Sequence, residues 1–484
     1  MNSTFKKIVP FYFIFAGLVF FTILSNLYRD GMFCDGLYYT TISNNLANGI
    51  GSFWQPKFTE MIFPQFYDHP PLVFGIESVF FKLLGNSIYV ERIYCFIIFL
   101  LAGFLIIKTW HLLVKDQQNL KPYSILALIL WILNEDIQMG YANNLLESTM
   151  SIFVLLSTFL LFLSLEKKTP LRIFYILFAS LLLVCAFLCK GFTGLFPLGF
   201  FVLYALLYKN ISIKTLIVNS AILFVGFGFM IALLLSYEPA RNNLSNYMNI
   251  QVIGSLSGLR PENSRLSHFH LLGRFFDKNI LIILLVSLWI ILLKIRNIFF
   301  VSKSIVKKSI LLCFIGFSGI LPIMLSIKQA SYYIIAALPF IYMSVALFVS
   351  ESVSIRFQQW KVNSISYKIF FALSILILIS GIIYSSFQWG KIDKRDKSTL
   401  IDVHLIGQEI KNEKFVSFKN RNFDGTLSAF FFRHYKISLN SPKEDLRNYE
   451  IIEKSIDTIT NPKYKLVNLP TIKYNLYKLD SSSE

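Results

Sequence analysis

Long apolar runs recur along most of this chain, and they restrict its fold more than any other feature of the sequence. A run of roughly 18 or more apolar residues is long enough to cross a lipid bilayer as a helix. Hydrophobic residues make up 55% of the chain and charged residues only 15%. The sequence therefore predicts a polytopic α-helical membrane protein and excludes a soluble one. Eleven spans are expected, at residues 8–28, 88–110, 123–141, 147–165, 172–189, 191–208, 215–236, 278–295, 309–327, 332–350 and 368–388.

The connections between these runs differ in charge, which predicts how the chain is threaded through the membrane. Lysine and arginine gather before the first run and in every second connection, and such segments face the cytoplasm by the positive-inside rule. The first run follows Lys6 and Lys7 and lacks a cleavage site before Arg29, so we expect a retained signal anchor. The odd number of spans then places the loops 29–87 and 237–277 and the tail 390–484 on the outer face. In a Gram-negative cell this face is the periplasm.

The charge balance bears on partners as well as on topology. The formal net charge is +18, and basic inner loops account for much of it. A nucleic-acid partner is not expected from so apolar a chain. The expected surroundings are the lipids of a bacterial inner membrane.

Two domains are predicted, with the boundary where the apolar runs end. Residues 1–389 form the transmembrane domain. The tail at 390–484 is predicted to be a small α/β or α+β domain, with a helix at about 400–412 and strands at 415–418, 428–432 and 466–469.

The first outer loop contains two short segments that are predicted to be ordered. Residues 36–48 form an amphipathic pattern closed by Asn48-Gly49, which predicts a helix lying along the membrane interface. The apolar stretch 72–84 is too short to cross comfortably, so we expect it to be interfacial or re-entrant. If it spans, the count becomes twelve and the tail changes side.

Three ionisable residues of the same loop are candidates for chemistry, because ionisable groups beside membrane spans are functional candidates by default. Asp35 follows the first span and is suited to accept the proton of an attacking hydroxyl as a general base. It is equally explained as the N-cap of the helix that follows. Asp68 and His69 offer ligands to a divalent metal ion, although an Asp-His-Pro-Pro sequence is also an ordinary turn.

Further candidates lie in the outer turns and in the second outer loop. Glu147 opens the fourth span and is either a second carboxylate of the site or an acid favoured by the helix dipole. His268 and His270 either complete a metal site with Asp68 or form an exposed pair without a role. Four cations are suited to hold an anionic phosphate, although interfacial cations also simply reach lipid head groups: Lys190, Lys328, Arg260 and Arg265.

Taken in order, these residues resemble one enzyme family. The resemblance is to the GT-C integral-membrane glycosyltransferases, in the branch of aminoarabinose transferases and dolichyl-phosphate-mannose-protein mannosyltransferase-like proteins. It covers about residues 5–350. The matching order is a first span, Asp35 with its amphipathic helix, Asp68-His69-Pro70-Pro71, Glu147, Lys190-Gly191, a histidine-bearing outer loop, and Lys328 before Tyr332-Tyr333.

The resemblance implies inverting transfer of a sugar from a polyprenyl-phosphate donor to lipid A, a glycan or a protein. Asp35 matches the family's first-loop catalytic aspartate, which is the implied general base. Lys190 and Lys328 match basic positions around the carrier phosphate. Glu147 stands where the family usually has an aspartate.

The remaining positions concern a metal and the pocket wall. Asp68 matches an acidic position that helps to bind a metal, so a divalent metal ion is the one cofactor implied. His69 stands where the aminoarabinose branch has a lysine near the lipid phosphate. His69 and Tyr332 are expected to lie in the same pocket.

Two other functions remain as alternatives. A polymerase or ligase of surface glycan would use outer-loop arginines as its main site and would need no first-loop aspartate. A transporter or flippase of a lipid-linked sugar would place charges near mid-span and show an internal repeat. The sequence has neither of these transporter features, so a transferase is the preferred function.

Overall fold

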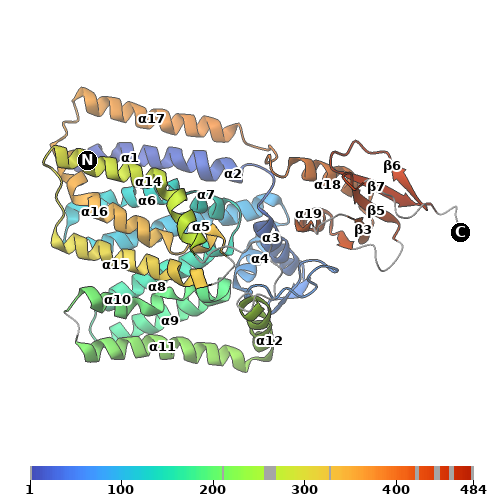
Figure 1. Ribbon diagram of the computed structural model, residues 1–484, viewed down its shortest axis with the longest axis horizontal. Coiled ribbons are helices and arrows are strands. Elements are labelled where there is room, and N and C mark those ends of the chain that lie inside the picture. Colours follow the sequence, from blue (N-terminus) through green and yellow to red (C-terminus); the bar gives the residue numbers. More distant parts are fainter. Residues whose placement is uncertain are drawn as a thin grey trace. The chain divides into compact units, whose positions relative to one another are not determined.

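The computed structural model describes residues 3–209, 212–254, 269–325, 329–419, 424–440, 447–456 and 463–480. By its packing the chain divides into two compact units, whose helices and strands are labelled in Figure 1. We call the first the membrane unit, and it comprises Met1–Leu27, Asp68–Leu72 and Cys95–Gln388. The second, the sheet unit, comprises Tyr28–Tyr67, Val73–Tyr94 and Trp389–Glu484. The first outer loop therefore belongs mainly to the same unit as the tail.

Long apolar helices dominate the membrane unit, as the apolar runs predict. Among the described residues, nine helices are long and apolar enough to cross a membrane, or ten if one bent pair is a single span. A multi-pass membrane protein is thereby confirmed. The nine are Lys6–Leu27 (α1, Ser3–Val19; η1, Phe20–Leu24; α2, Ser25–Leu27), α5 (Ile88–Leu113), α8 (Leu146–Ser164), α9 (Leu171–Lys190), α11 (Ile213–Ser236), α14 (His270–Ile295), α15 (Lys303–Ile320), α16 (Leu338–Gln359) and α17 (Ile365–Ser386).

The predicted span at 123–141 is broken. It consists of η2 (Gln118–Tyr123), α6 (Ser124–Leu133) and α7 (Glu135–Ala142), and the last helix bends away by 83°. The break has a local cause at Asn134, whose side chain accepts hydrogen bonds from the backbone N–H groups of Asp136 and Ile137. An asparagine in this role starts a new helix, so α7 takes its own direction.

The predicted span at 191–208 is shorter than expected. Two 3₁₀ turns, η3 (Gly191–Gly194) and η4 (Phe196–Gly199), precede the short helix α10 (Phe200–Leu207). Gly191 has a positive φ of 77°, and Pro197 lies at the start of η4. The resulting apolar helix, Phe196–Leu207, falls outside the set of full-length candidate spans. In the described ranges, the eleven predicted spans are therefore replaced by nine long helices, a bent pair and one short helix.

The helices of the membrane unit differ in how much of their surface is buried. α16 is buried over most of its length, because it packs against α15 and α6, while α8 packs against α9. By contrast, α11, α14 and α17 keep most of their surface exposed, with apolar side chains such as Phe229, Leu284 and Leu376 directed outwards. A helix that exposes such side chains is suited to contact lipid rather than water.

The sheet unit is a mixed five-stranded sheet with helices. The sheet has the order β4-β3-β5-β7-β6, in which β3 pairs in parallel with β4 and β5, and β7 pairs antiparallel with β5 and β6. This confirms a small mixed α/β domain in the tail. Its elements are α18 (Lys397–Glu409), β3 (Phe415–Lys419), α19 (Gly425–Tyr435), β4 (Ser438–Asn440), β5 (Tyr449–Glu453), β6 (Tyr464–Val467) and β7 (Tyr474–Leu479).

The first-loop part of the sheet unit contains two helices and a small hairpin. The helix predicted at 36–48 is found as α3 (Cys34–Ala47), and it ends at Asn48 before Gly49, whose φ is +76°. The hairpin pairs β1 (Gly51–Ser52) with β2 (Gln55–Pro56). α4 (Leu72–Leu84) has 13 residues and is absent from the candidate spans of the described chain, in line with the prediction for 72–84.

One predicted element of the tail is wrong. Residues 428–432 were expected to form a strand, but they lie in α19. Asp424 accepts a hydrogen bond from the backbone N–H of Leu427 and so caps the start of this helix. Lys436, with a left-handed φ of 58°, ends it. A short run of aromatic residues has no decisive periodicity, so the cap decides between helix and strand.

Candidate active site

A cavity of about 290 Å³ lies within the membrane unit. Its wall is formed by the end of α9 with η3 and η4, by η5 (Met248–Ile253), by η6 (Leu321–Leu325) and by η7 (Ser331–Ile334). Most of the surface that lines the cavity is apolar, although about half of the lining residues carry a polar group, as is usual for sites that orient a largely apolar ligand. The polar lining residues are His69, Lys190, Thr193, Tyr247, Gln251, Ser318 and Tyr333, and the others are Phe192, Phe196, Val252, Gly319, Pro322 and Ile323.

Among the described residues, Lys190 is the one lysine of this lining, and the end of its helix fixes its place. Lys190 is the last residue of α9, and Gly191 follows with a φ of +77°. A Cβ atom on Gly191 would lie 1.8 Å from the hydroxyl oxygen of Tyr247. Glycine is therefore required here both by the backbone conformation and by the close approach of Tyr247. Burial raises the pKa of Tyr247, so its hydroxyl stays protonated and able to donate a hydrogen bond.

The ammonium group of Lys190 is buried and forms an ion pair with Glu147 of α8. Only 7% of Lys190 and none of Glu147 is exposed. The same ammonium lies 4.6 Å from the ring centroid of Tyr333 and 5.6 Å from that of Tyr332. A carboxylate partner and two aromatic faces are the kinds of neighbour that offset the cost of burying an ammonium group.

A second, partly buried ion pair contacts Ser331 at the start of η7. Lys278 of α14 contacts Asp136 of α7 at 2.5 Å, and Ser331 donates to the same carboxylate oxygen at 2.8 Å. Lys278 also donates to the Ser331 hydroxyl oxygen at 2.8 Å. Since Tyr332 and Tyr333 follow Ser331 in η7, this ion pair anchors the short helix that presents the aromatic rings to Lys190.

Lys278 is not among the site residues predicted from the sequence. The sequence nevertheless contains a signal that could have identified Lys278. It is an ionisable residue at the first position of a predicted span, and such residues are functional candidates by default. Asp136 interrupts the apolar run predicted at 123–141, but the sequence gives no partner for it. Their pairing across 142 residues depends on the packing of α7 and α14, which local sequence does not report.

Asp35 lies in the sheet unit, in the first turn of α3, and is half-buried. The N-cap of α3 is Phe33, and no side chain caps the helix. The N-cap alternative for Asp35 is therefore wrong. An acidic residue in a first turn is nevertheless favoured by the helix dipole.

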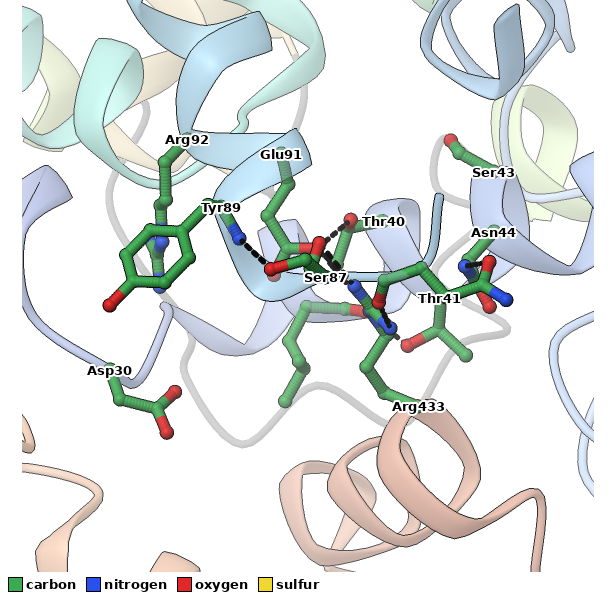
Figure 2. A network of polar contacts seen from close by, with 12 residues as sticks. Asp30, Thr40, Thr41, Ser43, Asn44, Ser87, Tyr89, Glu91, Arg92 and Arg433 are labelled. Atoms are coloured by element: carbon green, nitrogen blue, oxygen red, sulfur yellow. Dashed lines mark hydrogen bonds and ion pairs between the residues drawn. The ribbon is translucent and has the colours of Figure 1, made fainter. Parts of the chain in front are cut away.

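A buried network holds the middle of α3, as Figure 2 shows. Thr40 donates to Glu91 of α5 at 2.9 Å, and Arg433 of α19 contacts the same carboxylate oxygen at 2.9 Å. Arg433 also donates to the backbone carbonyls of Asn86 at 2.9 Å and Ser87 at 3.2 Å. All of Thr40, Glu91 and Arg433 are at most 5% exposed. The helix that carries Asp35 is thus fixed by the tail.

The C-terminal half of α3 is held by a second cation from the tail. Lys436 donates to the side-chain oxygens of Asn44 at 2.6 Å and Asn45 at 3.0 Å. Burial, and then the nearby charge of Arg433, lower the pKa of Lys436 to about 8. These two asparagines explain why polar residues of α3 are buried rather than facing solvent.

The predicted site residues are distributed between the two units. His69 lines the cavity with Lys190, and Tyr332 lies beside it through its contact with that lysine. Asp68 is half-buried in the bend before α4, and His270 is the first residue of α14, outside the cavity lining. Lys328, Arg260, Arg265 and His268 lie outside the described residues.

The metal ligands predicted from sequence are not gathered in the described part of the chain. No group of three or more histidine, cysteine, aspartate or glutamate residues that could hold a metal ion occurs there. The divalent ion stays a prediction, because His268 is one of its proposed ligands and is not described. No chemical step below is routed through a metal.

No family model and no curated protein matches the sequence. Solved structures do match, and they define the fold as GT-C-like, that of a class of integral-membrane glycosyltransferases. The crystal structure of ArnT from Cupriavidus metallidurans in the apo state has a TM-score of 0.61 at 12% identity and covers 98% of both chains. The same protein bound to undecaprenyl phosphate gives 0.60 at 13% identity, again over 98% of both chains.

A more distant match supports the same fold class. The apo oligosaccharyltransferase of Archaeoglobus fulgidus has a TM-score of 0.53 at 12% identity and covers 91% of this chain and 65% of its own. The predicted fold class, a polytopic helical protein with a small mixed-sheet domain and a GT-C-like arrangement, is confirmed. Identities this low concern the fold alone.

Proposed function

We propose that this protein is a GT-C glycosyltransferase that moves a sugar from a polyprenyl-phosphate donor to an acceptor hydroxyl. The observation that carries the proposal is the cavity with a buried, ion-paired lysine in an otherwise largely apolar wall. A ligand that is mostly hydrocarbon with one anionic group has this chemistry. The fold match extends over 98% of a protein whose solved structure holds undecaprenyl phosphate, which is a ligand of that kind.

Lys190 is the proposed phosphate-binding residue of the cavity. A polyprenyl phosphate becomes an adequate leaving group when its developing charge is stabilised by a preorganised cation. Tyr247, kept protonated by burial, is placed in the same wall as a hydrogen-bond donor. Glu147 balances and orients Lys190, a role that adds to its predicted place as a second carboxylate of the site.

Asp35 is the proposed general base. The acceptor oxygen attacks the anomeric carbon of the sugar, the bond from that carbon to the phosphate oxygen breaks, and the acceptor's proton passes to the Asp35 carboxylate. Polyprenyl phosphate leaves with the electron pair of the broken bond, and a single displacement inverts the anomeric centre. Asp35 is half-buried at the start of α3, whereas the residues farther along this helix are mostly buried. A partly exposed carboxylate suits a general base that takes a proton from an acceptor hydroxyl.

The proposed setting is the bacterial inner membrane, with the first outer loop and the tail in the periplasm. The acceptor is lipid A, a glycan or a protein. The metal ion predicted from Asp68, His268 and His270 is not required by the steps above.

The direct test is transfer of a radiolabelled sugar from a polyprenyl-phosphate donor by the purified full-length protein. Asp35→Asn should lower the transfer rate by about a hundredfold or more, the usual contribution of a general base. Donor affinity should be unchanged, because Asp35 is not assigned to the carrier phosphate. Glu60→Gln is the matched control, since Glu60 is an exposed carboxylate of the same loop that pairs only with Lys57, at 3.7 Å.

The outcomes separate the parts of the proposal. Normal transfer by Asp35→Asn would reject this residue as the base. Binding of the donor lipid without transfer by any form, together with movement of the lipid across vesicles, would favour the transporter alternative.

A further inference from the structure

A second cavity, of about 180 Å³, lies in the membrane unit where α14 and α16 end. It is lined by two arginines and two tryptophans, Arg296, Arg356, Trp289 and Trp360, with Leu293 and Phe357 beside them. None of these residues belongs to the cavity that holds Lys190. The two cavities are therefore separate.

The two guanidinium groups have no acidic partner in the described part of the chain. Arg356 lies over the ring of Trp360, 5.7 Å from its centroid. The nearest carboxylate in the sequence of α16, Glu351, is already used by Gln117 at 2.9 Å and by the backbone N–H of Ser302 at 2.5 Å. Two unneutralised arginines beside one cavity provide forked donors that match the oxygens of a phosphate.

The apolar surroundings show which kind of phosphate suits this cavity. Leu292 lines the cavity and is also exposed, and Leu288 and Ile291 of α14 are exposed next to it. A lipid can lay its acyl chains on this face of α14 while its head group enters the cavity. Tryptophan and arginine at the ends of apolar helices are the residues typical of the membrane interface.

We propose that this cavity binds the phosphate of an anionic phospholipid at the side of the membrane where the basic loops lie. Basic pockets between membrane-spanning helices bind such head groups, and each cation near the surface adds to the attraction. The site is separate from the donor site, and the inference does not depend on the proposed transferase activity.

The test uses the full-length protein in nanodiscs of phosphatidylcholine, to which phosphatidylglycerol is added. Lipid retained by the protein is counted by native mass spectrometry, and the melting temperature is followed in parallel. Arg296→Gln with Arg356→Gln should weaken phosphatidylglycerol binding by about tenfold or more, the effect of losing two such cations. Lys167→Gln with Lys168→Gln removes the same charge from an exposed basic loop and should leave the binding unchanged.

Three results would overturn the proposal. They are equal loss in both double variants, no loss in the arginine variant, or displacement of phosphatidylglycerol by millimolar inorganic phosphate, which would indicate a soluble ligand instead. If the arginine double variant does not melt like the wild type in phosphatidylcholine alone, Arg296→Gln serves in its place, because Arg296 is exposed and its loss should still weaken binding.

Discussion

Lys190 places its ammonium group in a buried wall, where a cation is costly without partners. Glu147 and the rings of Tyr332 and Tyr333 are these partners. The geometry is possible because Gly191 lets α9 end where Tyr247 covers it. A charge that is held in place before the ligand arrives costs no reorganisation during the reaction.

The ion pair can be tested by removing one partner and then both. Lys190→Met leaves Glu147 buried without its cation, so the free energy of unfolding should fall by about 3–5 kcal/mol. Lys190→Met with Glu147→Gln should regain most of this stability, because no buried charge remains. Thermal melting of the three forms measures the effect.

Donor binding then separates stability from function. Both variants should bind the polyprenyl-phosphate donor more weakly than the wild type, since both lack the cation. Recovery of donor binding in the stable double variant would show that Lys190 does not hold the phosphate.

At the scale of elements, α19 fixes α3 through two cations. Arg433 is linked to Thr40 in the middle of α3 through the shared carboxylate of Glu91, and Lys436 contacts Asn44 near the end of α3, while Asp35 lies at its start. The tail is therefore part of the machinery that positions the proposed base. This explains why polar side chains such as Thr40 and Asn45 occur at buried positions of α3.

Loss of Arg433 should loosen α3. In Arg433→Met the Glu91 carboxylate stays buried without its cation. Amide hydrogen exchange at residues 34–47 should therefore become faster, and the rate of sugar transfer should fall. Lys465→Gln removes a cation from an exposed pair in β6 and is the matched control. Unchanged exchange in α3 would contradict the positioning role of Arg433.

The lowered pKa of Lys436 predicts a pH dependence. In the unfolded chain the pKa of this lysine returns to its ordinary value of 10.5, so between pH about 8 and 10.5 the unfolded state binds more protons than the folded state. The stability of the wild type should therefore rise with pH in this window relative to Lys436→Met. Melting temperatures of both forms from pH 7 to 10.5 provide the measurement, and parallel curves would contradict the prediction.

At the scale of the whole molecule, the order of basic loops constrains the number of crossings. The loops 115–121, 167–172 and 209–214 lie on one side only if the bent pair α6–α7 and the short helix Phe196–Leu207 both cross the membrane. With the nine long helices of the described residues, these two crossings would make eleven, the odd number predicted from the sequence, and the two termini would then lie on opposite sides. A short helix can cross where neighbours bury its ends.

Labelling with a membrane-impermeant maleimide tests this arrangement. Lys465→Cys in the tail should react in intact spheroplasts, and Lys167→Cys should react only after permeabilisation, with the wild-type protein giving the background of its five cysteines. Both positions are exposed. Labelling of both from the same side would reject the predicted topology.

The sequence by itself determined the elements whose cause is local. Apolar runs fixed most of the membrane helices, because lipid requires a long apolar helix wherever the chain crosses. Asn48-Gly49 fixed the end of α3, and Lys190-Gly191 marked the end of α9. Asp35, His69 and Lys190 were selected as candidates because ionisable residues beside spans are costly.

The tertiary structure alone decided which of these groups meet. Glu147 and Lys190 are 43 residues apart, Asp136 and Lys278 are 142 apart, and Glu91 and Arg433 are 342 apart. Such pairs form only when helices pack against each other, and helix packing is set by surfaces rather than by local propensity. For the same reason Lys278 and Arg433 were not predicted as site residues. The role of a buried charged residue depends on its partner, and only the fold brings that partner next to it.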